Sequence, residues 1–359
     1  MKIAYLSGGL NRFGGTERVL SQIANNLSEK GYEIVIVSMC GESKSFFPLD
    51  DRIKTYYLNS PGFSKKILST IGKLKKIIKD EKPDVWVDVD YILGLYSGIV
   101  RKAYPKMKWV SWEHFCYYYR FPYYVGLRKA VRKYVCKKAD YLAVLSKEDK
   151  KDYTDNIKRI KAELVQIYNP IPERVFDEKV NRQKTVLAAG RLTKIKGFET
   201  LLDVWSKIEK DNPEWKLVIA GDGEDRELLK TKISTLGLKH VEMPGLVKNM
   251  DKLYSEASIY AMSSTNEGFA MVLLEAMGYG LPCIAFDCKC GVKEAVDDGK
   301  NGYVINSGNI DDYAYKLQRI MSDEVLRNEM SGKAKKMAEM FRPEIIVKEW
   351  VKLFDSMKV

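Results

Sequence analysis

The sequence predicts an α/β protein built from two doubly wound domains of similar design. Short β-branched or aromatic runs alternate with amphipathic helical segments, which is typical of a parallel sheet with helices on both faces. The alternation restarts after a polar segment, Asn169 to Lys184, that holds two prolines and lacks periodicity. At 359 residues the chain is also long for one hydrophobic core. Two domains joined by a linker are therefore expected.

We expect four segments along the chain. Residues 1–170 form the N-terminal domain, 171–184 form the linker, and 185–340 form the C-terminal domain. Residues 341–359 form a C-terminal helix that we expect to pack back toward the N-terminal domain.

The net charge of +12 is unevenly distributed. Residues 1–180 hold 33 Lys and Arg against 21 Asp and Glu, whereas residues 181–359 hold 27 of each class. A basic half of this kind suits an anionic membrane surface or a nucleic acid, and both interpretations stay open at this point. No apolar run reaches the roughly 18 residues of a membrane-spanning helix, and the first residues do not have the form of a signal peptide. The sequence therefore indicates a cytoplasmic protein.

Residues 1–38 predict a βαβ unit with a glycine-rich loop. The loop glycines, which free the backbone for close approach to a ligand, are Gly8, Gly9, Gly14 and Gly15. Their spacing is not the dinucleotide-binding fingerprint. By itself the loop is equally consistent with a ligand site and with a tight turn.

Residues 64–80 predict an amphipathic helix that is strongly basic. Its apolar stripe consists of Ile67, Leu68, Ile71, Leu74, Ile77 and Ile78, and lysines surround the stripe. Residues 115–138 also place aromatic side chains beside cations, an arrangement that suits a lipid headgroup interface. The helix is equally consistent with a surface helix packed on the core, and the aromatic rings could instead stack nucleic-acid bases.

Polar residues lie at the ends of the strand-like runs of the first half. The runs are 83–90, 108–115 and 139–146. Asp88 and Asp90 have the D-x-D spacing of a metal-nucleotide site, which alternation within a strand explains equally well. His114 lies in the second run just past its strand-like part, Trp109 to Trp112, at the carboxyl end where open α/β sheets bind ligands. His114 is therefore a candidate site residue.

The second half places charged residues at the carboxyl ends of its predicted strands. Arg191 and Lys196 follow the first of these strands, and a guanidinium fork beside a point charge would suit the two phosphates of a diphosphate. A solvated basic loop is equally compatible with the pair alone. Gly221 ends the next strand and Glu267 ends a later one. Because these ends share one edge of a parallel sheet, we expect the residues to gather there.

Residues 261–287 contain the most informative loop of the chain. Glu267 precedes a Gly-Phe turn that leads into a helix, and Glu275 follows about two turns into that helix. The N-terminus of a helix exposes backbone N–H groups that suit phosphate oxygens. The two carboxylates could line one pocket for a polyhydroxylated anion.

Five segments together resemble the family 4 retaining glycosyltransferases of the GT-B fold. They are GGTERV, EHF, GRLTKIKG, AGDGED and EGFAMVLLEAMGYGLPCIAFD. The resemblance covers essentially the whole chain. It implies two Rossmann-like domains facing across a cleft, and transfer of a sugar from a nucleotide diphosphate sugar without a metal or cofactor.

The resemblance also implies roles for the matching residues. Arg191 and Lys196 would clamp the donor diphosphate and stabilise the departing nucleoside diphosphate. Glu267 would hold hydroxyls of the donor sugar, Glu275 would hold the ribose hydroxyls, and His114 would lie near the donor sugar. Further donor contacts would come from Gly15, Gly221, Gly268, Phe269, Ala270 and Met271, and the acceptor side would include Gly14 and Glu113.

The family retains the anomeric configuration of the donor. Same-face attack, with a donor phosphate oxygen taking the acceptor proton, would need no carboxylate nucleophile. One segment departs from the family pattern. Where many relatives have Gly-Pro, residues 290–294 read CGVKE, which puts the donor contacts of that loop in question.

The leading hypothesis is a hexosyl- or N-acetylhexosaminyltransferase that takes a UDP-sugar and acts in surface polysaccharide or glycoconjugate synthesis. Its acceptor would be a glycan on a polyprenyl diphosphate, and the protein would lie at the inner face of the cell membrane, against anionic lipid. A GT-B-fold sugar-nucleotide epimerase is the alternative. A nucleic-acid-binding protein is a weaker one, because no base-reading motif accompanies the charge, and no nucleic-acid partner is expected.

Overall fold

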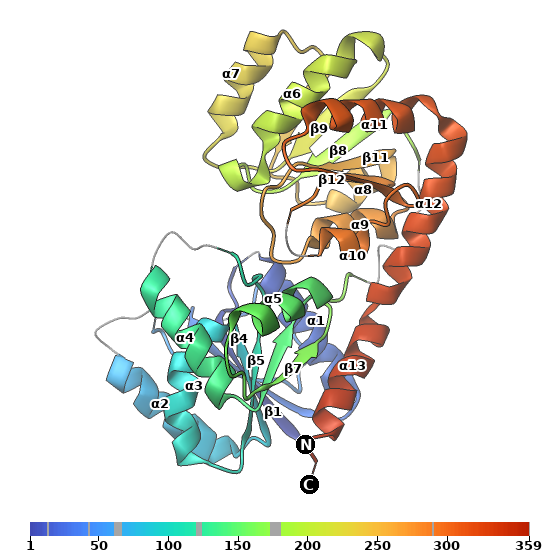
Figure 1. The fold of residues 1–359 in the computed structure, drawn as a ribbon. Coiled ribbons are helices and arrows are strands. Elements are labelled where there is room, and N and C mark those ends of the chain that lie inside the picture. Colours follow the sequence, from blue (N-terminus) through green and yellow to red (C-terminus); the bar gives the residue numbers. More distant parts are fainter. Residues whose placement is uncertain are drawn as a thin grey trace. The chain divides into compact units, whose positions relative to one another are not determined.

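The computed structural model divides the chain into two compact units, which Figure 1 shows as ribbons. The first unit comprises residues 1–170 and 343–359, and the second comprises residues 171–342. The structure describes residues 1–12, 14–41, 44–60, 67–119, 124–172, 181–288 and 291–358. Most of the predicted linker, 171–184, lies outside the described residues.

The first unit contains a seven-stranded parallel sheet. Its strands are β1 (Lys2–Gly9), β2 (Glu33–Cys40), β3 (Lys54–Tyr57), β4 (Val85–Val89), β5 (Lys108–Trp112), β6 (Tyr141–Val144) and β7 (Glu163–Gln166). They lie in the order β3-β2-β1-β4-β5-β6-β7. The order reverses direction between β1 and β4, so the loops after these two strands flank the position where doubly wound sheets bind ligands.

Helices cover both faces of this sheet. They are α1 (Gly15–Glu29), α2 (Ile67–Glu81), α3 (Gly94–Val100), α4 (Val125–Lys138), α5 (Lys147–Asn156) and α13 (Pro343–Asp355). Helix α13 packs on α1, while α2 packs on α3 and α3 on α4 (Figure 1). The C-terminal helix therefore completes the first unit.

Helix α2 overlaps the predicted basic helix, but its apolar stripe is narrower than expected. Leu74, Ile77 and Ile78 are buried in the core beneath the helix. The prediction was wrong for Leu68, whose side chain is 79% exposed, while the neighbouring Thr70 is buried. The first residues of the predicted helix, 64–66, lie outside the described part of the chain.

The second unit contains a six-stranded parallel sheet. Its strands are β8 (Thr185–Ala189), β9 (Lys216–Ala220), β10 (Val241–Gly245), β11 (Ile259–Met262), β12 (Cys283–Phe286) and β13 (Gly302–Ile305). They lie in the order β10-β9-β8-β11-β12-β13. Here the direction reverses between β8 and β11, which are paired through Ile259–Val186 and Tyr260–Leu187.

Helices also cover both faces of the second sheet. They are α6 (Phe198–Ile208), α7 (Arg226–Leu236), α8 (Met250–Glu256), α9 (Met271–Gly278), α10 (Val292–Ala295), α11 (Ile310–Ser322) and α12 (Glu324–Ala338). Helix α6 packs against α7 and α11, and α9 packs against α12. Among the described residues, no helix is both long and apolar enough to cross a bilayer.

Candidate functional site

Lys196 and Glu267 form an ion pair where the order of the second sheet reverses. Lys196 lies in a short 3-10 helix, Lys194–Lys196, after β8, and Glu267 lies in the loop after β11. The Lys196 Nζ donates to Glu267 Oε1 at 2.7 Å and to Oε2 at 3.0 Å. Because β8 and β11 are neighbours whose helices leave in opposite directions, their loops open a site at the carboxyl edge. The pair thus joins the two loops that define this edge.

Backbone contacts also hold these two loops together. The Thr265 N–H donates to the Ile195 carbonyl at 2.8 Å, and the Ser263 hydroxyl donates to the Lys196 carbonyl at 2.9 Å. Gly197 has φ +64°, and a Cβ at this position would lie 2.2 Å from the Ser263 carbonyl oxygen. Only glycine therefore allows the loops this close, and Lys196 and Glu267 are set on a fixed frame.

Glu275 lies in α9 and is almost fully buried. It is the fifth residue of the helix, a little over one turn from its start, rather than the two turns expected. Burial raises the pKa of Tyr260 well above its usual range, and the charges of Glu267 and Glu275 also raise it. The structure therefore brings both glutamates into the neighbourhood of one buried tyrosine in β11.

The turn before α9 leaves only part of its backbone available to a ligand. Phe269 and Ala270 are buried, and Gly268 is partly exposed. The Met271 N–H donates to the Phe269 carbonyl at 2.6 Å, so this N–H is already used in the structure. The expected donor contact from Met271 would require the turn to open.

Arg191 differs from Lys196 in its surroundings, although both follow β8. Its side chain is 76% exposed, and its Nη2 lies 3.5 Å from Glu224 Oε2. An exposed pair of this kind contributes little to stability. The Arg191 guanidinium is therefore available to an anion at the same edge.

Gly221 lies where the end of β9 meets the end of β8. It has φ +140°, and a Cβ there would lie 1.9 Å from the Gly190 carbonyl oxygen. Gly223 is similarly constrained, because its Cβ would lie 2.3 Å from the Leu192 carbonyl oxygen. The two glycines allow the β9 loop to lie against the β8 loop that carries Arg191.

The first unit contributes a second group of candidate residues at the carboxyl edge of its own sheet. Gly14 precedes α1 and Gly15 is its first residue. His114 follows β5 and is buried against Trp112, with ring centroids 4.4 Å apart. Burial lowers the pKa of His114 to about 3, so its imidazole is neutral. Its Nε2 is buried without a hydrogen-bond partner among the described residues, as expected of an atom that meets a ligand.

Glu113 has structural partners. Its Oε1 accepts the Tyr91 N–H at 2.9 Å, and its Oε2 accepts the Tyr153 hydroxyl at 2.8 Å. Burial, followed by the charge of Asp90, raises the pKa of Glu113 well above its usual range. The buried carboxyl orders the segment after β4 and helix α5, and its assignment to the acceptor side stays a prediction.

Arg132, one of the cations expected at a headgroup interface, instead organises the aromatic stretch of the first unit, which was not predicted. Its guanidinium lies 4.6 Å from the ring centroid of Tyr91, 4.9 Å from that of Tyr117 and 5.6 Å from that of Tyr153. Its Nη1 also donates to the Tyr117 carbonyl. Tyr117, expected at a headgroup interface, thus packs within the unit. The i, i+4 spacing of Arg128 and Arg132 on α4 was the available signal.

In the described ranges, no group of three or more His, Cys, Asp or Glu residues is placed to hold a metal ion. Asp88 accepts hydrogen bonds from the Trp86 indole at 3.2 Å and from the Trp109 indole at 2.7 Å. It is fully buried and points into the core. The D-x-D pattern is therefore explained by two structural positions: Asp88 lies in the core, and Asp90 lies directly after β4.

Two parallel-sheet, Rossmann-like units in one chain define the GT-B class of fold. Two family models match the chain: Glycosyltransferase Family 4 over residues 13–174 and Glycosyl transferases group 1 over residues 172–337. The chain belongs to the family 4 glycosyltransferases of the GT-B fold.

The whole chain is similar to bacterial glycosyltransferases. An uncharacterised glycosyltransferase of Haemophilus influenzae is 31% identical, with 97% of this chain and 98% of the relative covered. The GalNAc-alpha-(1->4)-GalNAc-alpha-(1->3)-diNAcBac-PP-undecaprenol alpha-1,4-N-acetyl-D-galactosaminyltransferase of Campylobacter jejuni is 31% identical, with coverage of 100% and 99%. The solved lipopolysaccharide outer core galactosyltransferase WaaB, in its apo form, is 25% identical with a TM-score of 0.76, and both chains are fully covered.

These relatives support a glycosyltransferase of bacterial polysaccharide or lipopolysaccharide synthesis. They do not favour the epimerase alternative, because they are named as transferases. The departure at 290–294 begins at a residue outside the described part of the chain; helix α10 starts at Val292 within it.

Proposed function

We propose that the protein transfers a hexose or N-acetylhexosamine, with retention, from a nucleotide diphosphate sugar to a glycan acceptor. A UDP-sugar is the favoured donor, and no metal or cofactor is expected. The observation that carries the proposal is the Lys196–Glu267 pair at the strand-order reversal of the second sheet, with Arg191 exposed on the same loop. Cations at this edge suit a diphosphate leaving group.

The three ammonium hydrogens of Lys196 allow it to bind two anions at once. One partner is Glu267, which fixes the direction of the side chain. The donor diphosphate would be the second partner, and Arg191 would close on it from the exposed side. Glu267 would then offer its remaining lone pairs to sugar hydroxyls, and Glu275 would bind the ribose hydroxyls. A donor phosphate oxygen would accept the acceptor proton.

The acceptor is proposed to be a glycan on a polyprenyl diphosphate at the inner face of the cell membrane. The name of the Campylobacter jejuni relative specifies a glycan on PP-undecaprenol. The excess of positive over negative charge lies in residues 1–180, which is consistent with a unit that works near an anionic surface.

A panel of nucleotide sugars incubated with a polyprenyl-diphosphate sugar tests the proposal. We expect one donor to give a glycosylated lipid. We also expect Glu275→Gln to weaken binding of the corresponding nucleotide, while circular dichroism shows that the variant remains folded. No product with any donor, together with nucleotide binding that Glu275→Gln leaves unchanged, would reject it. An incubation without acceptor that isomerises the sugar nucleotide would instead favour the epimerase.

A further inference from the structure

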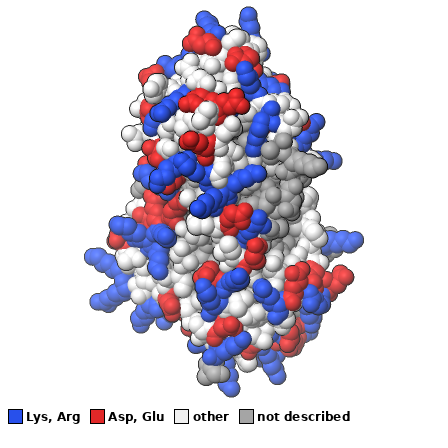
Figure 2. All heavy atoms as spheres, turned by 90° about the vertical axis from the view of Figure 1, so that its right-hand side faces the viewer, with Lys and Arg blue, Asp and Glu red and all other residues white. Residues whose placement is uncertain are grey.

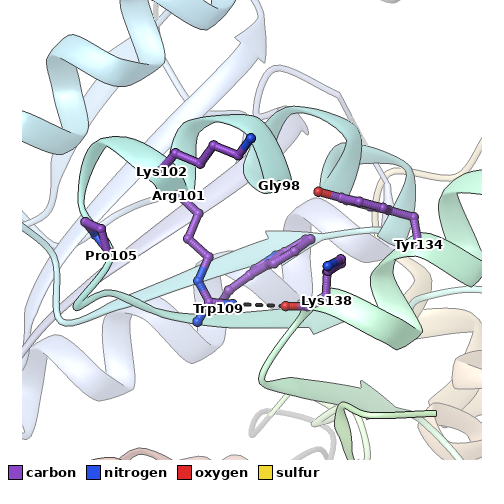
Figure 3. A pocket seen from close by; sticks show the side chains of 7 residues that line it. All are labelled: Gly98, Arg101, Lys102, Pro105, Trp109, Tyr134 and Lys138. Carbon is purple, nitrogen blue, oxygen red and sulfur yellow. Dashed lines mark hydrogen bonds between the residues drawn. The ribbon is translucent and has the colours of Figure 1, made fainter. Parts of the chain in front are cut away.

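A pocket in the first unit lies at the end of β5 away from the candidate site. It has a volume of about 680 Å³. Trp109, the second residue of β5, lies in it, whereas Glu113 and His114 follow the last residue of the same strand. The other walls come from residues 98–105 and from α4 (Figure 3). The lining of the pocket includes neither Glu113 nor His114.

One cation of the pocket is held in place by its own partners. The Arg101 Nη1 donates to the Lys138 carbonyl at 3.0 Å, and its Nη2 donates to Asp140 Oδ1 at 2.9 Å. Asp140 also accepts the backbone N–H of Trp109 at 2.7 Å. Arg101 therefore forms a fixed wall whose charge Asp140 balances.

The other two cations have no such balance. Lys102 and Lys138 are exposed and line the pocket. Within the described ranges, neither ammonium group has a carboxylate within ion-pair distance. The pocket thus has an excess of positive charge, and an anion is the ligand that would bind to both lysines.

Aromatic rings supply the rest of the lining. The ring centroids of Trp109 and Tyr134 are 6.3 Å apart, with planes tilted by 47°. A Cβ on Gly98 would lie 2.3 Å from the Tyr134 hydroxyl, so glycine is what lets Tyr134 pack over α3. Cations beside aromatic rings at a surface match the boundary between phosphates and apolar chains of a lipid layer.

The helices on either side of α3 extend this basic surface. Exposed lysines on α2 and α4 are Lys73, Lys75, Lys76, Lys79, Lys129, Lys133 and Lys137. Exposed apolar side chains on the same helices and on α3 are Leu68, Ile99, Val125 and Tyr134. Because α2 packs on α3 and α3 on α4, they belong to one face of the sheet. Over α13, on the other face, basic and acidic side chains are mixed (Figure 2).

We propose that this pocket binds the phosphate of an anionic phospholipid headgroup between Lys102 and Lys138. The neighbouring lysines of α2 and α4 lie against the surrounding lipid phosphates, and Leu68 and Ile99 meet the apolar boundary. This assignment rests on the membrane location proposed above and gives it a defined site, distinct from the donor site.

Sedimentation with vesicles of phosphatidylcholine, with or without phosphatidylglycerol, tests this site. The wild-type protein is expected to bind only the vesicles that contain phosphatidylglycerol. Reversing both pocket charges, Lys102→Glu with Lys138→Glu, should weaken that binding by at least about tenfold, since each basic residue near the surface contributes about 1 kcal/mol. The matched control, Lys30→Glu with Lys348→Glu, changes the net charge equally, directly after α1 and on α13, and should retain most of the binding.

Two outcomes overturn the proposal. One is no binding of wild-type protein to phosphatidylglycerol vesicles, whether or not the pocket binds soluble glycerol phosphate. The other is an equal loss of binding in the two double variants. Circular dichroism and urea unfolding show whether each variant is folded. Glycosyl transfer is measured separately with a water-soluble acceptor. A chain that binds vesicles but transfers no sugar would contradict the proposed function and leave the lipid site standing.

Discussion

Lys196 Nζ lies 2.7 Å from Glu267 Oε1 although the two residues are 71 positions apart in the chain. Their side chains are 22% and 11% exposed, so the pair is shielded from water more than a surface pair. In the proposed function, the ammonium group would thereby be oriented before the donor binds. Preorganised charge of this kind stabilises a leaving group without reorganisation during the reaction.

Replacing Lys196 should therefore affect both turnover and folding. We expect Lys196→Ala to lower turnover by about 10²-fold or more, and to cost about 1–3 kcal/mol of stability because Glu267 loses its partner while partly buried. Initial rates and urea unfolding measure the two effects. Lys194→Ala, at an exposed lysine of the same short helix, should change neither. Full turnover in Lys196→Ala would remove Lys196 from the site.

Replacing Arg191 tests the effect on turnover without a large loss of stability. Among the described residues its exposed side chain forms one ion pair, with Glu224 at 3.5 Å, so Arg191→Ala should change stability by less than about 0.5 kcal/mol. Turnover should nevertheless fall by about 10²-fold, because a charge at the leaving group is lost. Glu224→Ala removes the same contact from the other side and is the control. Equal rates for Arg191→Ala and wild-type protein would reject its assignment to the diphosphate.

The sequence predicted the fold because its signals are local. The predicted runs 83–90, 108–115 and 139–146 contain the strands β4, β5 and β6, since a short apolar run between turns is sufficient to predict a strand. The edge strands β3, β7 and β13 were not predicted; β3 and β7 begin with an exposed charged residue and have no fully buried side chain, so neither shows a continuous apolar run. Leu68 was misplaced because helical spacing alone does not set where the neighbouring core ends.

The candidate site was predictable only as a set of residues. Strand ends predicted that Lys196 and Glu267 share an edge, but the ion pair depends on the side-by-side position of β8 and β11, which spacing does not reveal. The cation–π contacts of Arg132 likewise join Tyr91, Tyr117 and Tyr153 from three separate segments. Contacts of this kind appear only once the sheet order is known.

The close approach at Gly221 predicts a large effect on folding. A methyl group there would lie 1.9 Å from the Gly190 carbonyl oxygen, and φ +140° disfavours any side chain. We expect Gly221→Ala to destabilise the second unit by more than about 2 kcal/mol. The control is Gly332→Ala in α12, where no atom lies within 4 Å of the added carbon. That change should stabilise by up to about 1 kcal/mol. Similar unfolding midpoints for both variants would contradict the packing at Gly221.

His114 makes a prediction about pH. Its pKa in the folded protein is lowered to about 3 by burial, whereas an unfolded histidine titrates near 6.5. Between these values the unfolded chain binds more protons than the folded chain, so stability is lost as the pH falls below about 6.5. The asparagine of His114→Asn does not titrate. Between pH 7.5 and pH 5, the free energy of unfolding of wild-type protein should therefore fall by about 1–2 kcal/mol more than that of this variant. Urea unfolding at the two pH values measures the difference.

The imidazole itself can be observed directly, because the chain contains only two histidines. In a His240→Gln variant the remaining histidine resonance belongs to His114. Its ring nitrogens should keep the shifts of a neutral imidazole from pH 8 to pH 5, since the buried Nε2 has no hydrogen-bond partner in the described part of the chain that could stabilise a proton. The Nε2 atom of a neutral imidazole can accept one hydrogen bond from a sugar hydroxyl or donate one to it, but the ring carries no positive charge. A titration midpoint near pH 6.5 would show that the His114 ring is hydrated or hydrogen-bonded, and would contradict the predicted loss of stability at low pH.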